Sequence, residues 1–221
     1  SGLPPGDREL YSARPVDKGL AALRLRSSRL PGSAFQYGPS SWEALGEFLK
    51  RRLPEHGANL PGFLAETVSK LGIRPMDWRR DGLGTPYLST GMVCGLNDLG
   101  RLGSVLADLA SGSERVGVSA AVFDDLTDRC PANPMFSAGI WWNRNAHMPG
   151  ARGVEPERSL DGVKTPAFWR NACLHPAARP EWFALVGSGG TRVYILPSES
   201  IVIAVARAGD SWSDAAMLSV C

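Results

Sequence analysis

The segment FALVGSGGTRVYILPSESIVIAVA, residues 183–206, decides the fold class of this chain. It holds three short runs rich in β-branched and aromatic residues, which predict strands over Phe183–Val186, Arg192–Leu196 and Ile201–Arg207. Gly-Ser-Gly-Gly separates the first two runs and Pro-Ser-Glu-Ser the last two, so two close hairpins form an antiparallel meander. Because residues 201–206 are all apolar, the last run is expected as a central strand covered on both faces.

Apolar residues upstream of this segment recur at helical spacing. The expected helices are Lys18–Leu25, Trp42–Leu53, Pro61–Leu71, Asn97–Ala110, Ala120–Asp128 and a last one from Trp212. Residues 130–180 are irregular and too long for a plain connection, so an insertion shaped by packing or by a disulfide is expected. Helices followed by clustered antiparallel strands indicate an α+β fold, with helices and loops over 1–180 and strands with a C-terminal helix over 181–221.

The composition is that of an ordinary globular protein, with 43% hydrophobic and 21% charged residues. A net charge of +2 is too small to indicate nucleic acid or an anionic membrane as a partner. No apolar run approaches the ~18 residues that cross a bilayer, so no membrane span is expected. The three histidines lack the spacing of metal ligands and the four cysteines form no Cys-x-x-Cys pair, so neither a metal nor a cofactor is expected.

The cysteines differ in their surroundings. Cys130 and Cys173 lie in loop sequence rich in Pro and Asn, and such cysteines can pair in an oxidising compartment. A Cys130–Cys173 disulfide is therefore one hypothesis for the irregular region. Cys94 lies in an apolar setting and is expected as a buried free thiol.

A second stretch, PGSAFQYGPSSW over residues 31–42, places a tyrosine beside the start of a helix. Pro-Gly marks a turn, and Phe35 and Tyr37 alternate around one polar residue as in a short extended segment. Gly-Pro ends that segment, and Ser40 with Glu43 has the pattern of a capping box. Tyr37 is therefore either an anchored core tyrosine or a positioned proton carrier.

Five motifs follow one another along the chain: SGLP from residue 1, PGSAFQY from 31, GLNDLGRLG from 95, FSAGIWWN from 136, and the strand segment from 183. In this order they resemble the C-terminal two thirds of the serine β-lactamase-like superfamily, which includes penicillin-binding proteins, esterases and amide hydrolases. The resemblance implies a β-lactamase/transpeptidase-like α+β fold, a helical region plus a C-terminal antiparallel sheet covered by helices. It also implies a single domain over 1–221 that is incomplete at its N-terminus, and a periplasmic or extracellular location.

The resemblance carries two candidate catalytic residues. Tyr37 matches the family's acid–base tyrosine, and the backbone N–H of Ser188 matches a donor to an oxyanion. Two family features are absent. No Ser-x-x-Lys nucleophile motif occurs, and Leu185-Val186-Gly187 stands where the family has Lys-Thr-Gly, which argues against ordinary penicillin recognition.

Three functions stay open on this basis. The first is a serine hydrolase that cleaves an ester or amide of a small molecule or peptide through an acyl-enzyme. Its Ser-x-x-Lys segment would lie upstream of residue 1, and the chain would associate with this N-terminal segment. Trp42 or Trp141-Trp142 would then wall the substrate site, or else pack in the core. The second is an inactive relative that binds a ligand or peptide, and the third is an unrelated α+β domain with coincidental motifs.

Overall fold

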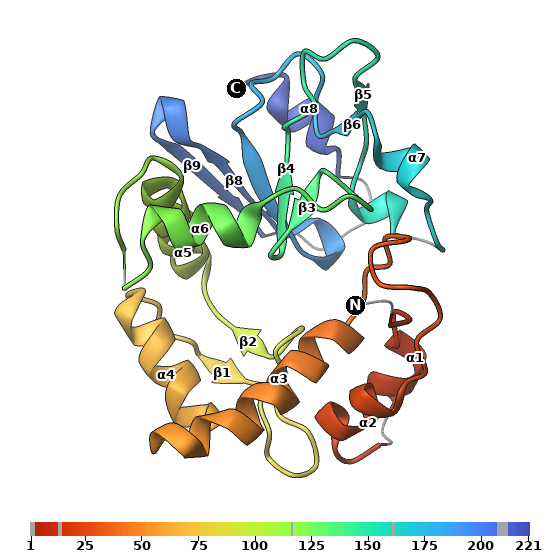
Figure 1. The fold of residues 1–221 in the computed structure, drawn as a ribbon. Helices are drawn as coiled ribbons and strands as arrows, with labels where there is room; N and C mark the ends of the chain where they lie inside the picture. The colour runs from red at the N-terminus through yellow and green to blue at the C-terminus, as the bar shows by residue number, and fades with distance from the viewer. Residues whose placement is uncertain (1–2, 13–14, 116, 161, 207–211) are drawn as a thin grey trace. The chain divides into compact units, whose positions relative to one another are not determined.

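The computed structural model describes residues 3–12, 15–115, 117–160, 162–206 and 212–221 (Figure 1). The backbone divides into two compact units, residues 1–98 and 99–221. The first unit carries three of the six expected helices, and the second carries the strand segment together with the other three. No helix in the described part of the chain has the length and apolarity that a membrane crossing requires.

The first unit is mainly helical. Its elements are α1 (Asp7–Leu10), α2 (Lys18–Arg24), α3 (Ser40–Arg52), the 3-10 turn η1 (Leu53–His56), α4 (Leu60–Lys70), β1 (Asp77–Trp78) and β2 (Met92–Val93). The two strands pair antiparallel. Side-chain caps set two of the helix starts, because Asp17 accepts from Leu20 N–H and Asn59 accepts from Gly62 N–H.

The expected helix over Trp42–Leu53 is present as α3, but the capping box predicted at its start is not formed. Pro39 is the N-cap, so Ser40 is already the first helical residue and its hydroxyl donates to the carbonyl of Pro4. The Glu43 carboxylate points away from the cap and accepts from Ser89 N–H at 3.0 Å and from its hydroxyl at 2.6 Å. The Glu43 carboxylate therefore binds Ser89, in a loop distant in sequence, instead of the N–H at the start of the helix that the local pattern predicted.

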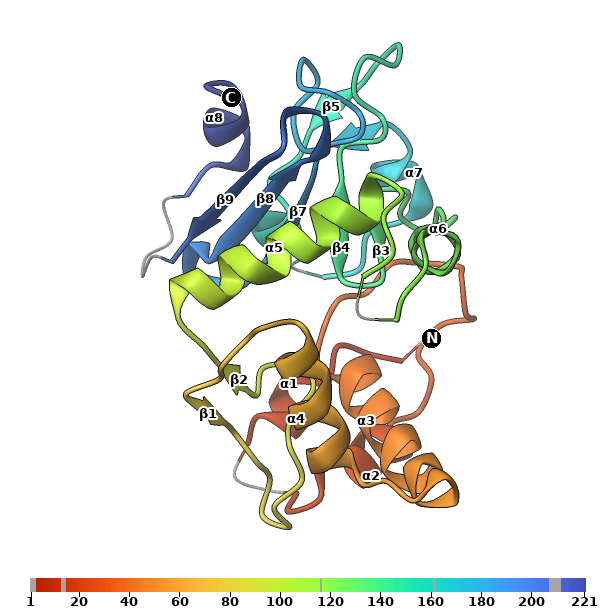
Figure 2. The same cartoon turned by 90° about the vertical axis from the view of Figure 1, so that its left-hand side faces the viewer.

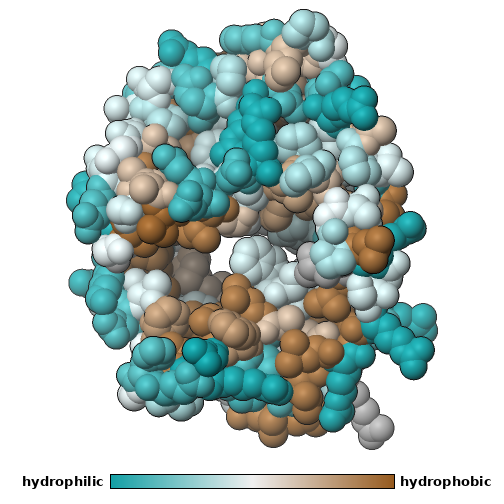
Figure 3. All heavy atoms as spheres, viewed as in Figure 1, coloured by the Kyte–Doolittle hydropathy of each residue, from teal (hydrophilic) through white to brown (hydrophobic). Residues whose placement is uncertain are grey.

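The buried face of α3 also differs from the expected apolar stripe. The buried residues are Ser40, Glu43, Gly46 and Glu47. Leu45 and Phe48 are 42% and 56% exposed. Exposed apolar side chains are common on this molecule, and Figure 3 shows several groups of them on the viewed face. The reason is a close approach of α2, because a Cβ on Gly19 would lie 2.9 Å from the Glu47 Cβ. The close contact between Gly19 of α2 and Glu47 of α3 therefore decides which face of α3 is buried.

The second unit is built on a five-stranded antiparallel sheet of order β3-β4-β7-β8-β9. Its strands are β3 (Phe136–Ser137), β4 (Ile140–Trp142), β7 (Phe183–Val186), β8 (Arg192–Leu196) and β9 (Ile201–Val205). The predicted meander is confirmed, with Val186 opposite Arg192 and Leu196 opposite Ile201 at its two turns. The other elements are α5 (Leu96–Ala110), α6 (Ala120–Thr127), β5 (Arg152–Gly153), η2 (Glu157–Ser159), α7 (Pro166–Trp169), β6 (Ala172–Cys173), η3 (Ser188–Gly190), η4 (Pro197–Glu199) and α8 (Asp214–Leu218).

Helices cover both faces of this sheet. Figure 2 shows α5 lying across the strands, and Val193 and Ile195 of β8 belong to the hydrophobic core that α5 and α6 help to form. Gly103 allows the close approach of α5, because a Cβ there would lie 2.4 Å from Val202 Cγ1. Successive side chains of a strand point to opposite faces, so Tyr194 lies on the other face, where it bonds to Asp214 of α8.

The prediction that the last strand is central is wrong. In the described residues β9 is the end strand of the sheet and pairs with β8. Apolar side chains on both sides of a strand indicate that both faces of the sheet are covered there. The place of the strand in the sheet depends instead on backbone pairing, which the side chains do not indicate. Ile201 is 44% exposed at the start of the strand, and Arg207, its expected end, lies outside the described residues.

The stretch 130–180 is not an irregular insertion, because it supplies β3 and β4 of the main sheet and the parallel pair β5–β6. The hypothesised Cys130–Cys173 disulfide is not formed, since all four cysteines are free. Cys173 is fully buried in β6, where burial raises the pKa of its thiol to about 11, whereas Cys130 lies in a turn that pairs with Asn133. Cys94 is free as expected but only half-buried.

Candidate functional site

The backbone on either side of Tyr37 is held by the N-terminal segment of the first unit. Gly38 packs directly on Pro5, and a Cβ at Gly38 would lie 2.5 Å from Pro5 Cα, which no larger residue tolerates. The N–H of Ser40 donates to the carbonyl of Pro5 at 3.1 Å, and its hydroxyl donates to Pro4. Residues 4–5, at the end of the SGLP motif, therefore contact residues 38–40, which follow the PGSAFQY motif, although Ser1 and Gly2 lie outside the described residues.

The surroundings of Tyr37 keep its phenol neutral. Burial raises its pKa above the ordinary value, and the nearby Tyr11 and Asp7 raise it further. A phenol in this state carries its proton at neutral pH and donates it rather than abstracting one. The described neighbours that shift this pKa are another phenol and a carboxylate, so the chain's own residues favour an acid role over a base role.

Sequence reasoning missed the neighbours of Tyr37. Partial burial raises the pKa of the Tyr11 phenol, and the side chains of Ser89 and Thr90 act on it in the opposite direction. Ser89 in turn donates to the buried carboxylate of Glu43. A chain of polar groups thus runs from α3 through the loop before β2 to Tyr11. No spacing could have indicated it, because its members come from three separate stretches of the sequence.

Ser188 lies in the turn between β7 and β8. Gly187 N–H closes this turn on the carbonyl of Thr191 at 2.9 Å, and Gly189 and Gly190 adopt φ values of 69° and 80° in the left-handed region that favours glycine. Ser188 is exposed, and the structure gives its N–H no acceptor among the described residues. This N–H can donate to an oxygen of a ligand, as the resemblance predicts.

A buried charge pair joins the start of β8, just after this turn, to the start of α8. Arg192 is 2% exposed and Asp214 is fully buried, and Arg192 Nε donates to Asp214 Oδ1 at 2.8 Å. The Tyr194 hydroxyl donates to the same oxygen at 2.5 Å. Burial raises the pKa of Asp214, and the hydrogen bonds from Arg192 and Tyr194 oppose this shift. Burial and the Asp214 carboxylate raise the pKa of Tyr194, which therefore stays a proton donor.

The two candidate residues belong to different units, Tyr37 to the first and Ser188 to the second. The contacts described above for each of them come from residues of its own unit. The tandem tryptophans are core residues rather than a substrate wall, because Trp141 and Trp142 are 1% and 7% exposed and the Trp142 ring lies 4.5 Å from that of Phe183. Trp42 is half-buried in α3. The described residues contain no group of three or more metal-ligating side chains.

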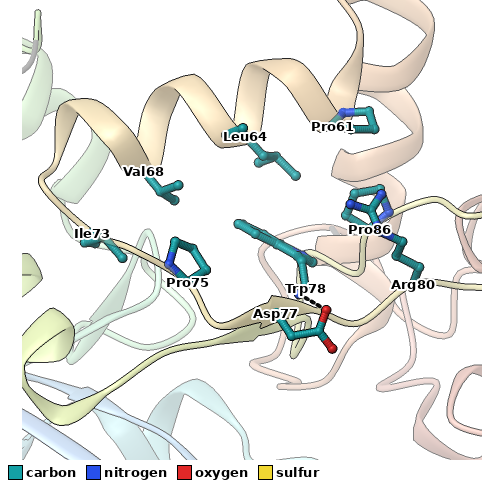
Figure 4. A pocket seen from close by; sticks show the side chains of 10 residues that line it. Pro61, Leu64, Val68, Ile73, Pro75, Asp77, Trp78, Arg80 and Pro86 are labelled. Carbon is teal, nitrogen blue, oxygen red and sulfur yellow. Dashed lines mark hydrogen bonds between the residues drawn. The ribbon is translucent and has the colours of Figure 1, made fainter.

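A cavity of about 380 Å³ lies under α4 in the first unit. Figure 4 shows Leu64 and Val68 pointing from α4 towards the Trp78 ring, with Asp77 and Arg80 at the margin. Trp78 Nε1 donates to the carbonyl of Tyr87, and neither Tyr37 nor Ser188 lines the space. The cavity offers an apolar surface without converging reactive groups, so it can hold a ligand but does not supply chemistry.

The chain was compared with known proteins. No protein-family model and no curated protein sequence matches it. A candidate β-lactamase from Bacteroides dorei DSM 17855 superposes with a TM-score of 0.54 at 16% identity, over 99% of this chain and 67% of that one. A β-lactamase from Mycobacterium bovis superposes with a TM-score of 0.52 at 20% identity, over 88% of this chain and 65% of that one. The fold is β-lactamase-like.

The predicted α+β, β-lactamase-like fold is thereby confirmed. At these identities the likeness concerns the fold alone. The chain spans about two thirds of the length of each matched structure.

Proposed function

We propose that this chain is part of a serine hydrolase that cleaves an ester or an amide through an acyl-enzyme. The observation that carries the proposal is the turn at Ser188. It presents a backbone N–H without an acceptor among the described residues, at the end of a strand in a β-lactamase-like sheet. A fixed N–H of this kind stabilises the negative charge that develops on a carbonyl oxygen during acyl transfer.

Tyr37 and Ser188 take different roles in this reaction. A serine nucleophile attacks the substrate carbonyl, and the resulting oxyanion accepts a hydrogen bond from Ser188 N–H. As the tetrahedral intermediate collapses, the neutral Tyr37 phenol protonates the leaving group. Residues 1–221 contain no Ser-x-x-Lys, so the serine and its activating lysine are proposed to come from a segment upstream of residue 1. A lysine beside Tyr37 would lower the phenol's pKa and let it also act as a base.

The substrate is proposed to be neutral near the scissile bond. Leu185 and Val186 are uncharged where the family has Lys-Thr, and they cannot bind a substrate carboxylate. Arg192 follows closely in sequence, but its guanidinium is already engaged by Asp214 and Glu157. This favours uncharged esters and amides over penicillins.

Hydrolysis of p-nitrophenyl esters by the full-length protein tests the proposal. Tyr37→Phe is expected to lower kcat by about 10²–10⁴-fold, the usual contribution of a proton-transferring side chain. Tyr87→Phe is the matched control, because Tyr87 lies in the same unit and also has a burial-raised pKa. Equal rates for wild type and Tyr37→Phe would contradict the role of Tyr37, and no hydrolysis of any ester or amide by wild type would contradict the function.

A second candidate function is ligand or peptide binding without turnover. The cavity under α4 favours it, because its walls are apolar and Trp78 forms one of its sides. Binding of an apolar ligand there would change Trp78 fluorescence and would be unaffected by Tyr37→Phe. This function is supported if such binding occurs in a protein that hydrolyses no ester or amide.

The proposed partner is the protein's own N-terminal segment, which we place on the free edge of β9. Among the described residues no strand pairs with that edge, although the strand is apolar throughout. An unpaired strand edge is a template for a further strand. In the full-length protein the amides of Ile201–Val205 that do not bond to β8 are expected to exchange with deuterium at least ten-fold more slowly than in chain 1–221. Equal exchange rates would contradict this placement.

A further inference from the structure

The peptide group that carries Ser188 N–H is anchored at its other end. This group joins Gly187 to Ser188, so the Gly187 carbonyl and the Ser188 N–H belong to one plane. Arg192 Nη1 donates to that carbonyl at 2.6 Å and to the carbonyl of Thr191 at 3.0 Å. In a trans peptide the C=O and N–H point in opposite directions. Holding the Gly187 oxygen on the guanidinium therefore directs Ser188 N–H away from Arg192.

The next peptide group is anchored as well, by Glu157 of η2. Its Oε1 accepts from Gly189 N–H at 2.7 Å, and its Oε2 accepts from Arg192 Nη2 at 2.8 Å. Burial raises the pKa of Glu157, but the hydrogen bonds from Arg192 and Gly189 outweigh it and hold the pKa below its usual range. The carboxylate is therefore charged at neutral pH and links the guanidinium to the turn.

The guanidinium itself is fixed from the far side. Asp214 binds Arg192 through Nε, and Asp214 stands at the start of α8, whose first N–H groups donate to Glu155. Arg192 thus has a carboxylate on each side and two turn carbonyls in front. A buried cation with this many partners has one favourable position, so it acts as a rigid support.

The turn needs such a support because of its glycines. Glycine residues occupy positions 187, 189 and 190, and peptide groups flanked by glycine can rotate at little steric cost. Without the anchors the Ser188 N–H could turn away from a substrate oxygen. The Ser188 side chain is itself exposed.

We propose that Arg192 and Glu157 are positioning residues that hold Ser188 N–H in the orientation of an oxyanion donor. The inference rests on the proposed hydrolase function for its catalytic consequence. Their proposed role does not require contact with the substrate. They act through the two peptide groups on either side of Ser188.

The test uses Glu157→Gln in the full-length protein. The side chain keeps its size and is 35% exposed, so the variant is expected to fold. It loses the charge that holds Gly189 N–H and Arg192 together. The kcat for ester hydrolysis is expected to fall about 10–100-fold, less than the 10²–10³-fold that follows from deleting an oxyanion donor, with KM unchanged. Glu181→Gln is the matched control, because its partner Arg179 is an exposed surface residue of the same unit.

A second measurement reads the turn directly. In ¹⁵N-labelled protein, the Gly189 amide is expected to exchange with solvent at least ten-fold faster in Glu157→Gln than in wild type. Unchanged Gly189 exchange would overturn the anchoring by Glu157, whatever the activity. Faster exchange with unchanged kcat would overturn the positioning role and leave the hydrolase function intact. No hydrolysis by wild type would overturn the hydrolase function and with it the catalytic consequence, while the exchange rate would still decide the anchoring.

Discussion

Asp214→Asn tests whether the buried charge network stabilises the second unit. Asp214 is fully buried and accepts from Arg192 Nε at 2.8 Å and from the Tyr194 hydroxyl at 2.5 Å. Asparagine keeps the shape of the side chain but removes the charge opposite a guanidinium that is 2% exposed. Removing one partner of a buried ion pair typically costs about 3–5 kcal/mol.

The lower end of that range is expected, because Arg192 retains Glu157 as a second carboxylate. A loss of about 3 kcal/mol is a large share of the 5–15 kcal/mol by which proteins are usually stable. For a chain of 221 residues it corresponds to a fall in Tm of about 6–12 °C.

Urea unfolding followed by circular dichroism measures the free energy of unfolding, and calorimetry measures Tm. Asp108→Asn is the matched control, because its pair with Arg115 has the same chemistry at 2.7 Å but is 40% and 54% exposed. That control is expected to cost about 0–1 kcal/mol. Equal losses in the two variants, or a loss below about 1 kcal/mol for Asp214→Asn, would refute the reasoning that burial makes the Arg192 pair important.

Three further predictions concern packing and pH. Gly38→Ala, which places a Cβ 2.5 Å from Pro5 Cα, is expected to lower Tm and to displace Tyr37, whereas Gly32→Ala meets no atom within 4 Å and reports only the strain of its φ of 79°. Gly103→Ala, with a Cβ 2.4 Å from Val202 Cγ1, is expected to cost about 1–3 kcal/mol in urea unfolding. Because the folded-state pKa of Glu157 is lowered, its stabilising effect is present above the ordinary carboxyl pKa of 4.5 and is lost as pH falls through the folded value. The stability of Glu157→Gln should therefore converge with that of wild type in acid, and an unchanged difference would contradict this.

The strand meander was predictable because its signals are local. Glycine-rich and proline-containing turns separate runs of β-branched residues, and both the turns and the runs lie within residues 183–206. β3 and β4 escaped prediction because strands of two or three residues are too short to show an alternating pattern. Their place in the sheet comes from the pairing of β4 with β7, which is distant in sequence, and of β3 with β4.

The candidate site was predictable only in part. Tyr37 and Ser188 were singled out by motif resemblance, and the structure supplies reasons for their fixed backbones. Glu157 and Asp214 gave no signal, because one lies in a stretch without periodicity and the other at the start of a short helix. Arg192 carried no signal of burial, since an arginine at the start of a strand ordinarily faces solvent. These contacts arise from the fold and not from spacing along the chain.

Covalent labelling tests the central claim most directly. The full-length protein is treated with a fluorophosphonate, digested and mapped by mass spectrometry. A serine hydrolase is expected to gain one phosphonyl group on a serine outside residues 1–221, at a rate that Tyr37→Phe lowers and Tyr87→Phe does not. Absence of any labelled serine would contradict the acyl-enzyme mechanism.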